Sequence, residues 1–256
     1  PGHPPTPAGY YWDDINADLL LNHARVMDRR LVLDSGARYA VLVLPPDDPQ
    51  LTPELLARMR DLVRDGATLV GSRPACSPSL QGYPDCDRQV QSLAAEMWGE
   101  MDGKGVTRHR LGQGQVVEGQ SLQTVLDGLG IAPDVALPQG FEFIHRALSG
   151  DGDAYFISNP KDAAVHQDCS FRVAGRTPEL WHPDTGLMET APAYTVKDGR
   201  TIVPLDFDPG GSIFVVFRKP CDATDHIVTP ARELRAVGEP IDVDEKWKLH
   251  FPPHWG

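Results

Sequence analysis

The sequence predicts an α/β unit with a doubly wound parallel sheet, followed by an antiparallel β-sandwich. Two observations carry this prediction. Between residues 39 and 71, an apolar run, an amphipathic helix pattern and a second apolar run follow one another, which is typical of a strand–helix–strand crossover. After Pro138, short β-branched and aromatic runs alternate with turns that contain Gly and Asp, which is typical of a sandwich.

The N-terminal elements are a short helix and two strands. Asp13 and Asp14 precede apolar residues that are spaced by about one helical turn, so a helix is expected over 14–24. The apolar runs 31–33 and 39–44, separated by a Ser-Gly turn, predict two strands. Because the second run is apolar throughout and ends at two prolines, we expect that strand to be buried on both faces.

The most clearly marked helix begins at Thr52. This residue is a good N-cap, Pro53 occupies the first helical position, and apolar residues recur with helical spacing until Gly66. The run 67–71 predicts a strand parallel to the preceding one, because a helix connects the two. Four further elements complete the unit: a loop over 72–84, a helix over 85–98, a strand over 115–117 and a helix from Ser121 to about Gly128.

The second half of the chain predicts short strands joined by tight turns. The strands are expected over 154–157, 170–173, 194–196, 201–203 and 212–217. The turns are expected over 184–186, 198–199 and 208–211. We place the change of architecture near 138–150 and expect four parts, namely residues 1–24, 25–140, 141–220 and 221–256.

Composition and charge exclude several function classes. The chain has 36 acidic and 24 basic residues and a net charge of −12, so its summed field repels nucleic acids and anionic membranes. No apolar run approaches the roughly 20 residues that a membrane helix needs. Residues 1–7 lack the basic and apolar regions of a signal peptide. We therefore expect neither a nucleic-acid partner nor a membrane partner, and we expect the chain to be part of a longer protein.

The sequence predicts no metal or cofactor site. The four cysteines show no C-x-x-C spacing: Cys76, Cys86, Cys169 and Cys221. Cys76 and Cys86 could close a disulfide in an oxidising compartment, although two free buried thiols are favoured. Asp206 and Asp208 are followed by two glycines where a calcium loop would need further oxygen ligands. Gly112-Gln113-Gly114 is interpreted as a turn rather than as a phosphate-binding loop.

Catalytic candidates are few, and each has a structural interpretation. Cys76 could act as an amidotransferase-like nucleophile with His109 as base, but its loop lacks a nucleophile elbow. His145 and His182 are expected to pack or to form hydrogen bonds. A glycosidase needs two carboxyl groups about 5–10 Å apart. The carboxylate pairs that could supply them are expected to cap a helix or to face solvent: Asp13/Asp14, Asp151/Asp153, Asp206/Asp208 and Asp242/Asp244.

Five groups of short sequence segments occur together in a characteristic order. They are residues 10–18, residues 39–45, residues 143–146 with 155–159, residues 171–173 with 178–181 and 185–186, and residues 210–217. Together they resemble the α-L-rhamnosidases of glycoside hydrolase family 106. The resemblance implies a large enzyme with a catalytic (β/α)8 barrel, then an amidotransferase-like α/β domain, then β-sandwich domains. Residues 1–24 would end or follow the barrel, and residues 221–256 would link to a further sandwich.

The resemblance also implies a function. The acid and base glutamates of the family belong to the barrel, so no residue of this chain inherits a catalytic, cofactor-binding or metal-binding role. We expect an accessory segment of an enzyme that removes terminal L-rhamnose, secreted or periplasmic, with the barrel and the next sandwich as partners. Aromatic residues near both ends, such as Trp12 and Trp247, should pack on these partners. Two alternatives remain: a carbohydrate-binding or protein-interaction module in which Trp181 and Tyr194 form a platform, and an amidotransferase-like enzyme that uses Cys76.

Overall fold

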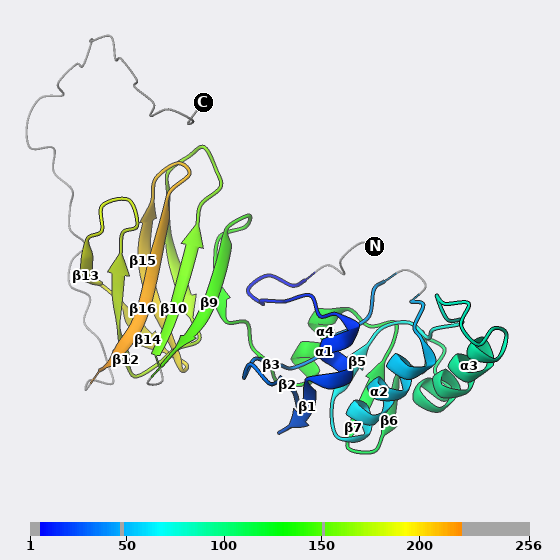
Figure 1. Ribbon diagram of the computed structural model, residues 1–256. Coiled ribbons are helices and arrows are strands. Elements are labelled where there is room, and N and C mark those ends of the chain that lie inside the picture. Colours follow the sequence, from blue (N-terminus) through cyan, green and yellow to red (C-terminus); the bar gives the residue numbers. More distant parts are fainter. Residues whose placement is uncertain (1–5, 47–48, 150–151, 222–256) are drawn as a thin grey trace, which may run out of the picture.

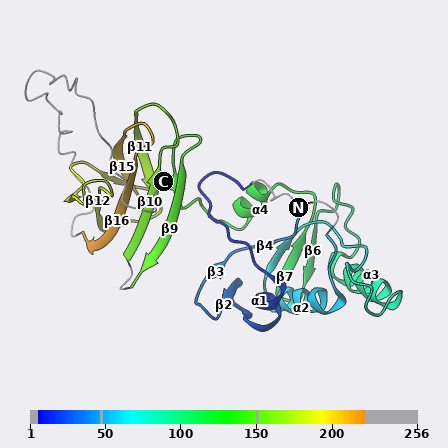
Figure 2. The same cartoon turned by 45° about the horizontal axis from the view of Figure 1, so that its top comes forward.

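The computed structural model describes residues 6–46, 49–149 and 152–221. Helices α1 to α4 lie together in one part of the molecule, and the long strands of the second half lie in the other (Figures 1 and 2). The strand-rich character that the sequence predicts for the second half is confirmed.

The first part is built on a four-stranded sheet in the order β4-β5-β7-β6. Its strands are β4 (Leu42–Val43), β5 (Thr68–Val70), β7 (Gly114–Val117) and β6 (Arg108–Leu111). β4, β5 and β7 are parallel, as the crossover pattern predicts, while β6 pairs antiparallel with β7. β6 was not predicted, because its sequence Arg-His-Arg-Leu has little apolar character. The turn at Gly112 is confirmed, since it joins β6 to β7.

Helices cover both faces of this sheet. Their bounds are α1 (Ala17–Asn22), α2 (Pro53–Arg64), α3 (Asp85–Trp98) and α4 (Leu122–Gly128). Thr52 and Ser121 cap α2 and α4 through their side-chain oxygens, as expected. α1 is shorter than the predicted 14–24, because the Asn16 side chain accepts the Leu19 N–H and starts the helix there. Asp13 and Asp14 therefore do not cap it.

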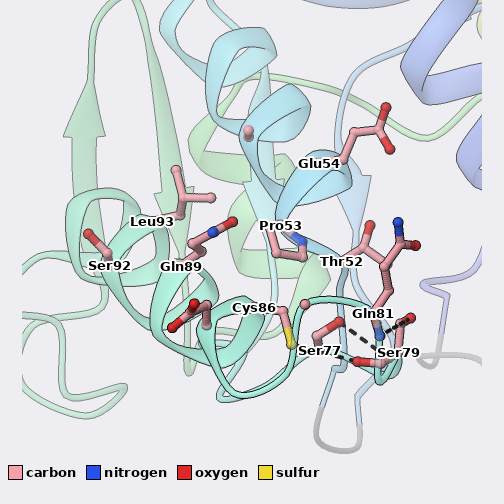
Figure 3. A pocket seen from close by; sticks show the side chains of 13 residues that line it. Thr52, Pro53, Glu54, Ser77, Ser79, Gln81, Cys86, Gln89, Ser92 and Leu93 are labelled. Carbon is pink, nitrogen blue, oxygen red and sulfur yellow. Dashed lines mark hydrogen bonds between the residues drawn. The ribbon is translucent and has the colours of Figure 1, made fainter.

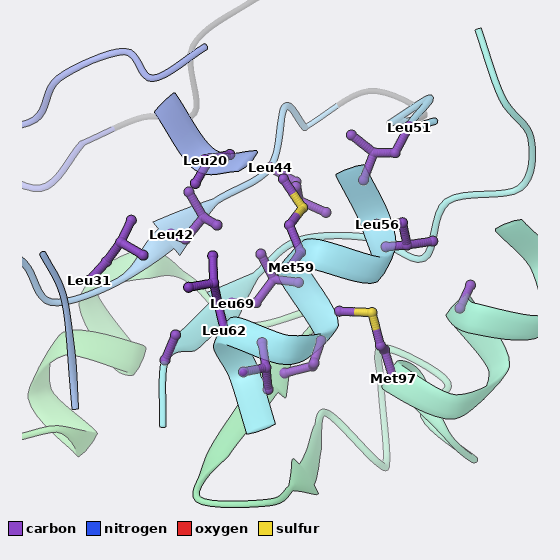
Figure 4. Packing of buried hydrophobic residues seen from close by; sticks show 14 of the residues in the cluster. Leu20, Leu31, Leu42, Leu44, Leu51, Leu56, Met59, Leu62, Leu69 and Met97 are labelled. Atoms are coloured by element: carbon purple, nitrogen blue, oxygen red, sulfur yellow. The ribbon is translucent and has the colours of Figure 1, made fainter. Parts of the chain in front are cut away.

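The core of this part lies between the sheet and the first three helices. Figure 4 shows side chains of α2 meeting those of β5 and α3, among them Leu56, Met59, Leu62, Leu69 and Met97. Burying each of these side chains stabilises the fold by about 1.5–3 kcal/mol. A smaller cluster on the opposite face joins Val70 and Val117 to Val125 of α4. The apolar residues that recur with helical spacing in the sequence thus pack against the two faces of one sheet.

The predicted strand over 39–44 is wrong, because it is divided between two sheets. Its beginning belongs to β3 (Arg38–Tyr39), the last strand of a small sheet with β1 (Ala24–Met27) and β2 (Arg30–Leu33). Its second half forms β4 and pairs with β5. Because β4 is an edge strand, Val43 is only half-buried, whereas Leu42 is buried.

The second part consists of two antiparallel sheets. One has the order β13-β12-β16-β10-β9 and the other has the order β14-β15-β11-β8. The strands of the first sheet are β9 (Glu142–Leu148), β10 (Gly152–Ser158), β12 (Arg176–Trp181), β13 (Met188–Thr190) and β16 (Ser212–Pro220). Those of the second are β8 (Val135–Ala136), β11 (Val165–Phe171), β14 (Thr195–Lys197) and β15 (Arg200–Phe207). Inward side chains from both sheets share one buried cluster, so the sheets form a sandwich.

Several strands of the sandwich differ from the prediction. β8, β9, β12 and β13 were not predicted, because charged residues interrupt β9 and Pro178 interrupts β12. The expected strand 170–173 begins five residues after the start of β11 and ends two residues after its end, so the two share only Ser170 and Phe171. β8 lies before residue 140 yet pairs with β11. The division of the chain at residue 140 stays a prediction, as does the role of residues 222–256, which lie outside the described residues.

Candidate functional site

The structure does not bring the predicted Cys76 and His109 together. The Nδ1 atom of His109 lies 2.9 Å from the carbonyl oxygen of Met97, which gives the ring a structural partner. Cys76 is half-buried in the loop after β5, and no interaction between it and His109 is found in the described part of the chain. Cys76 and Cys86 are both free thiols, as favoured from the sequence, but only Cys86 is buried.

The candidate carboxylates that the structure describes have other partners. Asp13 accepts a hydrogen bond of 2.8 Å from the hydroxyl of Tyr39. The Nδ1 atom of His166 lies 2.6 Å from Asp206, at an exposed site. Asp208 contributes its backbone carbonyl to the turn before β16. Asp151, Asp242 and Asp244 lie outside the described residues.

His145 lies at the edge of the sandwich, inside β9 rather than before the first strand. Its ring stacks on Tyr155, with centroids 4.2 Å apart and planes inclined by 3°. Its Nε2 atom lies 2.8 Å from Asp153 and its Nδ1 atom lies 3.3 Å from Asp134. Burial alone would lower the pKa of His145, but hydrogen bonds to the two carboxylates raise it to about 9. The ring is therefore held as an imidazolium that donates from both nitrogens.

Asp134 connects three segments of the chain. Its carboxylate accepts hydrogen bonds from His145 and from the guanidinium of Arg172, whose Nε lies 2.9 Å away. Its backbone N–H donates to the Gly9 carbonyl at 2.8 Å, and its carbonyl accepts from Arg200 at 3.3 Å. Burial would raise the pKa of Asp134, but the bonds from His145 and Arg172 lower it below its usual range. We call Asp134, His145, Asp153, Arg172 and Arg200 the junction cluster.

Residues 7–13 form an N-terminal strap that crosses the α/β part next to this cluster. The Tyr10 hydroxyl donates to the Ile131 carbonyl at 2.8 Å, and the Tyr39 hydroxyl donates to Asp13. Burial and the hydrogen bond to Asp13 raise the pKa of Tyr39 to about 12. The strap is therefore fixed by side-chain hydrogen bonds at its middle and at its C-terminal end.

The strap presents two aromatic side chains to solvent and covers a cavity. Tyr11 is 39% exposed and Trp12 is 46% exposed, and the guanidinium of Arg146 lies 5.8 Å from the centre of the Tyr11 ring. The cavity has a volume of about 430 Å³. It is lined by the strap, by β2 to β4, by α4, and by Asp134 and Arg172 of the junction cluster. Because His145 and Arg172 lower the pKa of Asp134, this carboxyl is held in its ionised form, which is the wrong form for a general acid. The site resembles a packing junction rather than an acid–base centre.

Gly9 allows the strap to approach the rest of the chain. Its φ is +81°, and a Cβ at this position would lie 2.1 Å from the Val135 carbonyl oxygen. Gly9→Ala should therefore push the strap away, with a loss of about 2 kcal/mol in the free energy of unfolding and faster proteolytic cleavage within residues 7–13. Gly36→Ala is a matched control, since Gly36 has φ +89° and no atom within 4 Å of such a Cβ. Equal effects of the two variants on strap cleavage would contradict the prediction.

Trp181 and Tyr194 do not form the expected platform. Leu180 points into the sandwich core, so its neighbour Trp181 lies on the outer face of its sheet. The guanidinium of Arg218 lies 5.0 Å above the Trp181 ring, and the indole N–H donates to Glu179. Tyr194 instead packs against the sandwich core. His182, which follows Trp181, lies 3.3 Å from Glu189 and has a hydrogen-bonding role.

Two features are absent from the described ranges. No group of three His, Cys, Asp or Glu side chains there could hold a metal ion. Within the same ranges, no helix has the length and apolar character that crossing a membrane requires.

The comparisons with known proteins find a family model, a curated relative and a solved structure that are similar to this chain. The model of the α-L-rhamnosidase family, glycoside hydrolase family 106, matches residues 2–196. A curated relative from Formosa agariphila, named "Putative beta-glucuronidase", is 31% identical over 231 residues and aligns with 88% of this chain and 18% of its own length. The structure of a rhamnosidase from Novosphingobium sp. PP1Y superposes with a TM-score of 0.78 and 33% identity over 88% of this chain. The chain spans about a fifth of each of these proteins, 18% of the relative and 21% of the rhamnosidase.

Proposed function

The chain belongs to the α-L-rhamnosidase family, glycoside hydrolase family 106, and we propose that it is an accessory, non-catalytic segment of an enzyme that removes terminal L-rhamnose from glycans or glycosides. One observation carries the non-catalytic role. The candidate carboxylates Asp13 and Asp153 are held by Tyr39 and His145 in structural contacts, and Asp134, which the sequence did not single out, is held by Arg172. Glycoside cleavage needs one protonated and one ionised carboxyl that face a sugar.

The proposed architecture follows the family. Residues 25–140 form an amidotransferase-like α/β domain, which is supported by three parallel strands with helices on both faces. Residues 141–220 form the sandwich domain, to which β8 of the preceding range adds one strand. Residues 1–24 connect to the catalytic barrel, and residues 221–256 link to a further sandwich. The strap has two exposed aromatic side chains, Tyr11 and Trp12, which support a contact with the barrel. Large apolar side chains that are exposed to solvent favour packing against another protein surface.

The structure favours neither the carbohydrate platform nor the amidotransferase chemistry. A carbohydrate platform on the sandwich would need an open aromatic face, but Arg218 covers the ring of Trp181 and Tyr194 is partly buried. Amidotransferase chemistry would need a base beside Cys76. The side chain of His109, the candidate base, instead contacts the carbonyl oxygen of Met97.

The proposed function predicts that residues 1–256 alone do not hydrolyse an aryl α-L-rhamnoside, whereas the full-length enzyme does. In the full-length enzyme, Glu142→Ala should change kcat by less than about twofold, because an exposed carboxylate that contacts no substrate does not contribute to the transition state. Steady-state release of the aryl group measures both. The proposal fails if residues 1–256 turn over the substrate and lose this activity in Asp13→Ala or Glu142→Ala.

A further inference from the structure

A second, larger hollow lies in the α/β part, away from the junction cluster. It is an open groove of about 850 Å³ between the start of α2, the loop 77–82 and the first half of α3 (Figure 3). β4 leads into α2 and β5 leads into this loop, so the groove lies beyond the carboxyl ends of parallel strands. Open α/β sheets place ligands at this edge. We propose that the groove is a surface binding site for a neutral oligosaccharide.

The charges of the groove favour an uncharged ligand. No Lys, Arg or His side chain lines it, and its acidic side chains are Glu54 and Asp85. Asp85 forms an ion pair with Arg88. Because the chain also has a net charge of −12, a phosphate or a carboxylate would be repelled both locally and by the summed field. The remaining polar groups of the lining are hydroxyls, amides and the thiol of Cys86.

The hydroxyl groups of the groove are arranged as donors. The Thr52 oxygen accepts from the Leu55 N–H at 3.3 Å and the Ser77 oxygen accepts from the Ser79 N–H at 3.2 Å. The Ser79 oxygen accepts from the Gln81 N–H at 3.1 Å. Each hydroxyl therefore still has its proton to donate. Figure 3 shows these side chains gathered at one end of the groove, where hydroxyl and ring oxygens of a sugar could accept from them.

The opposite wall supplies one amide, one hydroxyl and carbon surface. Gln89, Ser92 and Leu93 are spaced along one face of α3, and the two polar residues can both donate and accept. Pro53 and Leu93 offer carbon atoms to the C–H faces of a sugar ring. Tyr83 follows the lining residue Gly82 in the chain and is 65% exposed, so an aromatic side chain next to the groove in sequence is open to solvent.

The loop that forms one wall is fixed to α3, so the site is formed before a ligand arrives. The Ser77 N–H donates to Asp87 at 2.9 Å, and the Cys86 thiol lies 3.7 Å from the Ser79 carbonyl oxygen. Cys86 itself is buried. A preformed wall lowers the entropy cost of binding, which agrees with a specific site rather than a transient depression of the surface.

The test is an NMR titration of ¹⁵N-labelled residues 1–256 with methyl α-L-rhamnoside and with a neutral tetrasaccharide that ends in L-rhamnose. The choice of these sugars rests on the proposed function. We expect saturable shifts at the amides of Ser79, Gln89 and Ser92, and none with D-galacturonate. The double variant Gln89→Ala/Ser92→Ala keeps good helix formers on α3 and should weaken binding at least about fivefold. Gln123→Ala, on α4 and outside the groove lining, is the matched control and should bind like the unaltered chain.

The proposal is overturned if neither neutral sugar shifts these amides, or if the double variant binds as well as the control. Rhamnosidase activity of the full-length enzyme is measured separately with both variants. If the unaltered chain binds neither sugar while the full-length enzyme is active, the proposed binding site in the groove is refuted and the proposed function stands. Inactive full-length enzyme with intact groove binding would refute the proposed function alone.

Discussion

Asp134→Ala should lower the free energy of unfolding by about 3 kcal/mol, because it removes the carboxylate that pairs with both His145 and Arg172 of the sandwich. The variant leaves the cations of His145 and Arg172 without this partner. Breaking an ion pair with buried members costs about 3–5 kcal/mol. We expect the lower end of this range, since the side chains of Asp134 and His145 are each 19% exposed while that of Arg172 is 51% exposed.

Urea unfolding at pH 7, followed by circular dichroism, measures this loss. Asp206→Ala is the matched control, since Asp206 also pairs with a histidine, His166, but at a site where its side chain is 79% exposed. The control should lose less than about 1 kcal/mol. Asp134→Asn keeps the size of the side chain and removes the charge, so a loss close to that of alanine would assign the effect to charge. Similar small losses in Asp134→Ala and Asp206→Ala would refute the role of the junction cluster.

Local signals in the sequence were sufficient for helices α2, α3 and α4 of the α/β part. The Thr52-Pro53 start and the Gly66 end identify α2 almost to the residue, because caps and helical spacing act over a few neighbouring positions. The parallel pairing of β4 with β5 followed from the helix between them. The division of residues 39–44 did not follow, because it depends on two sheets that compete for one apolar run.

The junction cluster depends on residues far apart in the chain. Asp134, His145 and Arg172 meet only after β8, β9 and β11 are placed in the sandwich. Taken alone, His145 was correctly expected to pack and to form hydrogen bonds, but nothing near it in sequence identified Asp134 as its partner. Gly9 was likewise unremarkable in the sequence, although its positive φ is what brings the strap to Asp134. Long-range contacts of this kind leave no periodic pattern.

The stability of the chain should fall as the pH rises from about 7 to about 9.5, and His145 should be the cause. The unfolded-state pKa of histidine is about 6.5, whereas the hydrogen bonds to Asp134 and Asp153 raise the pKa of His145 to about 9. A group with a raised folded-state pKa stabilises the fold fully below its unfolded-state pKa, and this contribution is lost as the pH passes its folded-state pKa. The loss should be on the order of 3 kcal/mol.

The variant His145→Gln separates this contribution from other titrations. Glutamine can donate to one carboxylate but carries no charge. The free energy of unfolding of the variant should therefore be lower than that of the unaltered chain at pH 6.5 and should change little up to pH 9. Burial raises the pKa of Tyr155 and raises the pKa of Cys169 to about 12, so neither group that packs in this core titrates within the window. His166→Gln, at an exposed histidine, should keep the pH dependence of the unaltered chain. The measurement is urea unfolding at half-unit steps from pH 6.5 to 9.5. If the curves of the unaltered chain and His145→Gln run parallel, the imidazolium of His145 does not stabilise the junction cluster.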